Sequence, residues 1–145
     1  MTYAFLKLLH ILSMAAWLGA AMWVPGDVKR SLARGGPHLG PLAERTGPAI
    51  RVDLWAGVAT VATGLALMWR RGWLARGEMW VGAALGMVLL ALVAAVLVPT
   101  WSRMESRIRA DDAAGAGTAA PRLAVATGVG HLLWLVALSL MVLGR

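Results

Sequence analysis

Two histidines, His10 and His131, lie within the long apolar stretches of this 145-residue chain and are its strongest candidates for chemistry. An ionisable side chain inside the hydrocarbon of a membrane is costly, so such a residue indicates a functional site by default. Neutral imidazole binds transition metals and is a standard axial ligand of haem iron. The two side chains therefore predict a metal or haem site, which the rest of the chain must position.

The composition predicts that these histidines lie in membrane spans. Hydrophobic residues make up 59% of the chain and charged residues only 14%, and the mean hydropathy is +0.69. A spanning helix needs about 20 mainly apolar residues, and four stretches approach that length: residues 3–24, 49–69, 79–100 and 123–143. We predict one all-α domain, residues 1–145, folded in the lipid bilayer as an integral membrane four-helix bundle with up-down-up-down topology.

The net charge of +7 lies mainly between the apolar stretches, where membrane topology explains basic residues better than nucleic acid does. We therefore predict no nucleic-acid partner. One predicted side carries nine basic residues: Lys29, Arg30, Arg34, Arg45, Arg51, Arg103, Arg107, Arg109 and Arg122. The other side carries five: Lys7, Arg70, Arg71, Arg76 and Arg145. This bias predicts that both termini lie outside and that the two longer connections lie in the cytoplasm.

Glycine and proline indicate where the helices end. The Gly35-Gly36-Pro37 and Gly40-Pro41 sequences are expected to break any helix in the first connection. Pro48 suits the first turn of the second span. Residues 113–120, rich in alanine and glycine, are expected to form a flexible linker.

Charged residues near the spans are expected to form ion pairs. The third span continues as a helix through residues 101–109, where Glu105 and Arg109 stand at i,i+4. Asp53 is interpreted as a structural partner of Arg51 or of another helix, in preference to a role in proton transfer.

Small residues and missing cysteines limit the architecture further. Residue pairs such as Gly82 and Gly86 let helix backbones approach closely, within one bundle or in a homo-oligomer. The chain has no cysteine, which excludes disulfides, thiolate zinc sites, iron–sulfur clusters and covalent c-type haem. A cofactor must therefore use histidine, methionine, carboxylate or backbone groups.

On the first span, Lys7, Met14 and Trp17 share a helix face with His10 through i,i+3 and i,i+4 spacing. We expect this face to point into the bundle.

On the fourth span, Thr127 and Trp134 share a face with His131. Gly128 and Gly130 directly precede this histidine and would let a flat macrocycle approach the backbone, or would serve helix packing alone.

These faces predict a haem b held between His10 and His131. The depths of the two side chains differ by roughly 7–8 Å, which a tilted macrocycle could bridge. Lys7 would neutralise a propionate, with Arg70 or Arg71 available on the same predicted side. Iron with both axial positions filled has no open site, so one-electron exchange with a quinone or a redox partner protein is the expected role. No catalytic residue is assigned.

Other interpretations of the histidines remain open. His10 and Met14 lie one turn apart and could bind copper, since Cu(I) favours thioether ligands. Each histidine could also only hydrogen-bond a carbonyl of a neighbouring helix, in which case the chain would be a structural or accessory subunit.

The first span resembles that of the HemJ-type protoporphyrinogen oxidases. The LKLLHI run at residues 6–11 contains His10 and is followed by Trp17 and Pro25. The chain is also similar, more loosely, to membrane domains related to the copper-resistance protein CopD. The resemblance implies a bacterial inner-membrane protein with a haem b bound through His10, and an oxidoreductase that acts on a porphyrinogen.

The chain departs from the HemJ pattern at three points. The third span, residues 79–100, contains no lysine where that family carries an essential one. Gly26, in place of the common arginine, follows Pro25. His131 is not a feature of those oxidases, and it is a candidate replacement for the missing lysine. Without iron ligation by His131, an open coordination position would permit oxidase chemistry.

Overall fold

The computed structural model describes residues 2–70 and 77–143, which form helices joined by short turns, without a strand among them. In chain order the elements are α1 (Tyr3–Met22), α2 (Val24–Arg34), the short 3₁₀ turn η1 (Gly36–His38), α3 (Leu39–Arg70), α4 (Gly77–Leu92), the π-helical turn η2 (Val93–Leu97), α5 (Val98–Arg109) and α6 (Ala113–Leu143).

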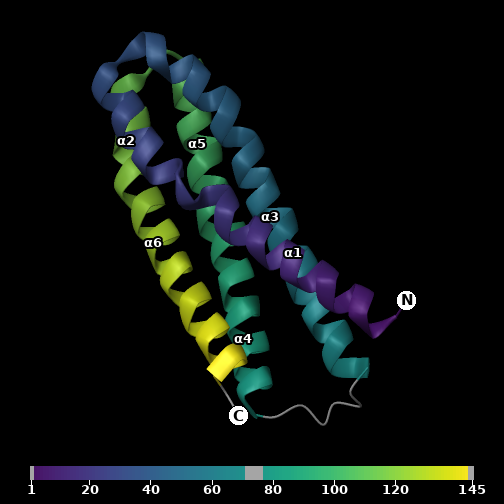
Figure 1. Ribbon diagram of the computed structural model, residues 1–145. Coiled ribbons are helices and arrows are strands. Elements are labelled where there is room, and N and C mark those ends of the chain that lie inside the picture. Colours follow the sequence, from purple (N-terminus) through teal and green to yellow (C-terminus); the bar gives the residue numbers. More distant parts are fainter. Residues whose placement is uncertain (1, 71–76, 144–145) are drawn as a thin grey trace.

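These elements build four long rods. The α1–α2 pair, α3, the continuous α4–η2–α5 helix and α6 are each long and apolar enough to cross a membrane. Figure 1 shows the turns before α3 and α6 at one end of the bundle and both chain termini at the opposite end. The prediction of an all-α membrane bundle of four helices is confirmed.

The first connection is far more helical than its sequence suggested. The helix is interrupted at Gly35, whose φ of 87° lies in the left-handed region that glycine adopts without strain. Gly40 and Pro41, expected to break a helix, lie in the first turn of α3, where backbone amides have no partner within the helix. Pro48, expected in a first turn, lies inside α3.

The alanine- and glycine-rich segment 113–120 is also helical, so its prediction as a flexible linker is wrong. Asp111 turns the chain with a positive φ of 60°, and the Gly115 amide then donates to Asp112 Oδ1 at 2.8 Å. This bond caps the new helix. Alanine has the highest helix propensity, so the segment forms the first turns of α6 once the cap is in place.

The end of the bundle with the two connections holds the larger core. Fully buried side chains there include Val24, Leu42, Met104 and Leu123, contributed by all four rods. Arg45 of α3 reaches back to α2 and donates to both carboxylate oxygens of Asp27, at 2.6 and 3.0 Å. The predicted Glu105–Arg109 pair is present at 2.6 Å.

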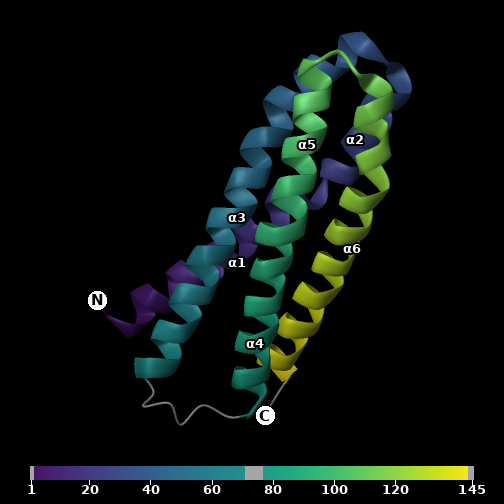
Figure 2. The ribbon, with the colours of Figure 1, turned by 180° about the vertical axis from the view of Figure 1, so that it is seen from behind.

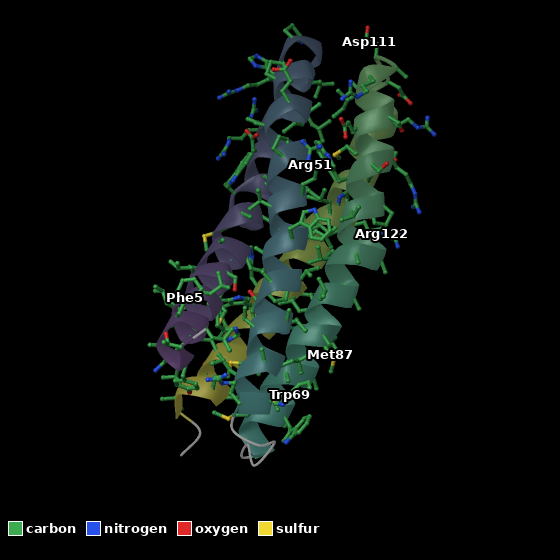
Figure 3. All side chains as sticks on the ribbon, turned by 90° about the vertical axis from the view of Figure 1, so that its right-hand side faces the viewer. Phe5, Arg51, Trp69, Met87, Asp111 and Arg122 are labelled. Atoms are coloured by element: carbon green, nitrogen blue, oxygen red, sulfur yellow. The ribbon has the colours of Figure 1, made fainter. Side chains whose placement is uncertain are left out.

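Asp53 does not form its predicted ion pair. The three ion pairs within the described ranges all lie toward the connection end, and none includes this residue. Arg51 is exposed on α3, and Figure 3 shows it between Asp111, at the connection end, and Trp69, near the opposite end. Asp53 lies two residues further along the helix and is buried, because a two-residue step rotates the side chain to another face of the helix.

α1 packs mainly against α3. A Cβ at Gly57 would lie 2.8 Å from the ring of Trp17, so this buried ring rests on bare α3 backbone. Figures 1 and 2 show the N-terminal end of α1 leaning away from α4 and α6. This half of the bundle contains the larger of the two cavities described below.

Candidate functional site

His10 is anchored on α3 through one ring nitrogen. Its Nδ1 lies 3.1 Å from the carbonyl oxygen of Thr60 and 2.9 Å from the hydroxyl of Thr63. That hydroxyl donates its own proton to the Ala59 carbonyl at 2.6 Å, and a carbonyl can only accept. Nδ1 therefore carries the proton, and the lone pair of Nε2 remains available for a metal.

The sequence of α3 makes this contact possible. Thr60, Thr63 and Gly64 are spaced three and four residues apart and share one helix face. A Cβ at Gly64 would lie 3.2 Å from His10 Cε1, so the missing side chain lets the imidazole lie against the helix. A protonated Nδ1 bonded to a backbone carbonyl is the usual support of a metal-binding histidine.

His10 lines a cavity of about 320 Å³ between α1, α3, α4 and α6, which we call the His10 cavity. Its walls are mainly apolar and include Val61, Leu65 and Ala83, while Lys7 supplies a cation. This volume lies at the lower end of the range for ligand pockets.

Two features of the His10 cavity fit a bound metal group. Nε2 of His10 is free to coordinate, and the hydroxyl of Thr60, which also lines the cavity, is buried without a hydrogen-bond partner in the described structure. A buried hydroxyl that lacks a partner is costly, and a polar atom of a bound ligand would satisfy it. These groups would suit a metal-containing cofactor held through Nε2 of His10.

Three methionines line the same cavity: Met68, Met79 and Met141. Met14, the predicted copper ligand, is not among the lining residues. The described part of the chain has no cluster of three or more histidine, aspartate or glutamate side chains that could hold a metal ion. A metal in the His10 cavity would therefore take its remaining ligands from a porphyrin or from thioethers.

His131 lines a different and much smaller cavity, of about 30 Å³, which we call the Asp53–His131 cavity. Trp17, Gly130 and Trp134 form part of its wall, together with the buried carboxyl group of Asp53. The two histidines thus line separate cavities, and their shared ligation of one iron stays a prediction.

The remaining predicted site residues are dispersed. Arg70 is exposed at the end of α3 and lines neither cavity. Gly128 is also exposed, and a Cβ there would meet no atom within 4 Å. A Cβ at Gly130 would contact Leu89 of α4 at 3.4 Å, so this glycine serves helix packing. Arg71 lies outside the described residues.

Sequence reasoning missed the polar partners of both histidines. Thr60 and Thr63 stand out as a threonine- and glycine-rich part of the second span, but the face shared by Lys7 and His10 does not reveal which helix it meets. Asp53 was assigned to an ion pair and instead lines the same cavity as His131.

Comparison of the chain with protein-family models, with curated proteins and with solved structures found no match.

Proposed function

We propose that this integral membrane protein binds haem b in the His10 cavity, where Nε2 of His10 would hold the iron. The observation that carries the proposal is the hydrogen bonding of Nδ1 to the Thr60 carbonyl and the Thr63 hydroxyl, at 3.1 and 2.9 Å. These bonds fix the ring tautomer and its orientation, as a metal ligand requires.

The chain's own residues supply binding and orientation. Thr60 and Thr63 hold the His10 ring, Lys7 offers a positive charge to a propionate, and the apolar walls exclude water. When bound, the haem supplies one electron at a time by cycling between ferric and ferrous iron. The proposed electron donor is a membrane quinol or a reduced redox protein. The proposed acceptor is a quinone or an oxidised redox protein.

We prefer a role in electron transfer over the oxidation of a porphyrinogen, because the third span lacks the lysine expected from the resemblance to HemJ. We also propose an inner-membrane location with both termini outside. The rods place the two arginine-rich connections at one end of the bundle, so the positive-inside rule would assign that end to the cytoplasm.

A visible spectrum of the full chain, purified in detergent after expression with added haem precursor, tests the proposal. We expect a Soret band, and we expect a His10→Ala variant to lose it. His38→Ala is the matched control, because His38 is exposed in the turn before α3 and lines neither cavity.

The result for His131→Ala separates two models of ligation. If His10 is the ligand and His131 is not, this variant should keep the Soret band. If both histidines bind the iron, the variant should show a five-coordinate spectrum or lose the haem. A folded wild-type protein that takes up no haem in reconstitution would overturn haem binding.

A Cu(I) site is a second candidate, favoured by the three methionines that line the cavity with His10. Soft thioethers select Cu(I) over harder cations. We expect stoichiometric Cu(I) uptake that is lost in a Met68→Leu/Met141→Leu variant and kept in Met22→Leu, since Met22 is exposed and outside the cavity. Equal uptake by both variants would exclude this site.

A further inference from the structure

Asp53 is the most unusual polar residue of the membrane-spanning region outside the His10 cavity. It lies within the second candidate span, and only 4% of its surface is exposed. No hydrogen bond or ion pair joins its carboxyl group to another residue of the described ranges. An ionised carboxylate without a partner is costly in such surroundings, so this group must keep a proton or share one with a nearby base.

The base is available across the Asp53–His131 cavity. Among the residues that line this cavity, from α1, α3, α4, η2 and α6, Asp53 and His131 are the two titratable ones. The remaining wall is mainly apolar and includes the rings of Trp17 and Trp134. Within the described ranges, no other charged residue lines the space that these two groups share.

The cavity is of the right size for a proton carrier. Its volume of about 30 Å³ accommodates a single water molecule, which needs two to four polar neighbours. The carboxyl group of Asp53, the imidazole of His131 and the hydroxyl of Thr127 supply three. The Thr127 hydroxyl donates its proton to the Leu123 carbonyl at 2.9 Å, so it faces other neighbours as an acceptor.

The backbone beside the cavity is also irregular. Val93 and Leu97 line the wall, and they are the first and last residues of the π-helical turn that joins α4 to α5. Single π-helical turns within α-helices occur frequently at functional sites. This irregularity is a second, independent sign that the region does more than pack.

We propose that Asp53 and His131 form a proton-binding site inside the bundle, in which one exchangeable proton is held between the carboxyl group and the imidazole. Transfer through one water moves a proton from the carboxylic acid to the ring nitrogen and leaves a carboxylate and an imidazolium. Atoms and charge balance without another reactant. The site does not depend on the haem proposal, because it involves a different cavity.

Infrared spectroscopy of the full chain in lipid nanodiscs tests this site, with ¹³C-labelled aspartate to identify the carboxyl bands. We expect a protonated aspartate carbonyl band near neutral pH that shifts in D₂O and is lost in Asp53→Asn. Asp27→Asn is the matched control, because the Asp27 carboxylate accepts two hydrogen bonds from Arg45 and should contribute no such band.

The role of His131 is tested by His131→Gln, which keeps hydrogen bonding but removes the titrating ring. We expect the midpoint of the carboxyl titration to move to higher pH by about one unit, the size expected for coupled sites. A midpoint unchanged in this variant would overturn the shared site, as would a band that persists in Asp53→Asn. Asp53→Asn is nearly isosteric, so it should leave the fold intact. A melting curve for each variant distinguishes a change in the carboxyl band from failure to fold.

Discussion

The two histidine cavities differ in size, in polar neighbours and in what the histidine can do. In the His10 cavity, of about 320 Å³, Nδ1 is held by two groups of α3 and one ring nitrogen is left for a ligand. The Asp53–His131 cavity, of about 30 Å³, is lined by the second histidine and a buried aspartate and is too small for a cofactor. We therefore propose metal binding for one histidine and proton exchange for the other, because their neighbouring residues differ.

The largest effect on stability is expected where α1 and α3 approach each other closely, beside the two cavities. Gly57→Ala places a methyl group 2.8 Å from Trp17, which forms a wall of the smaller cavity, whereas Gly64→Ala contacts His10 at 3.2 Å. We expect Gly57→Ala to lower the free energy of unfolding by about 1–3 kcal/mol, and Gly64→Ala to lower it less. Reversible denaturation in detergent measures both.

Gly128→Ala is the control for these glycine variants. A Cβ there meets no atom within 4 Å, so the change should leave stability unchanged or raise it through helix propensity. A Gly57→Ala protein as stable as Gly128→Ala would show that Trp17 does not rest on α3 as described.

The support of His10 is expected to have the next largest effect. Thr63→Val removes the hydroxyl that accepts from Nδ1 and leaves the Thr60 carbonyl in place. We expect haem affinity to fall about tenfold, as for other supporting groups of metal ligands. Haem titration followed by absorbance measures the change.

The same variant sharpens the distinction between the cavities. Thr63 does not line the Asp53–His131 cavity, so the infrared carboxyl band should be unchanged in Thr63→Val. Thr118→Val, on the exposed surface of α6, should alter neither signal. A band that moves in Thr63→Val would mean that the two sites are coupled.

The smallest effect is expected at the connection end, far from both sites. The Gly115 amide, and then Arg107, hold the pKa of the Asp112 carboxyl below its ordinary value. This group therefore stabilises the folded state above the unfolded pKa of about 3.9, and the contribution is lost as pH falls below that value. We expect the melting temperature to drop in acid, and to drop less steeply in Asp112→Ala.

Arg107→Ala refines this prediction. Because the Gly115 amide is the larger cause of the lowered pKa, the Arg107 variant should keep most of the acid sensitivity. An acid-dependent loss of stability identical in wild type and Asp112→Ala would contradict the assignment.

Much of the fold could be predicted from local sequence, and the failures have local causes. The Glu105–Arg109 pair follows from helical spacing and is present. The segment 113–120 was misjudged because alanine and glycine occur in both linkers and helices, and the capping contact of Asp112 with Gly115 decides between them. Pro41 likewise marks a helix beginning here, where a break was expected.

The sequence by itself determined a four-rod membrane bundle and two histidines within it, because hydropathy and helical spacing act along one chain segment at a time. Only the tertiary structure decided that His10 meets Thr60 and Thr63, and that His131 shares a cavity with Asp53. Helical spacing fixes the direction in which a side chain leaves its own axis, but the packing of the rods fixes which group stands opposite. The chemistry of an imidazole depends on that opposite group.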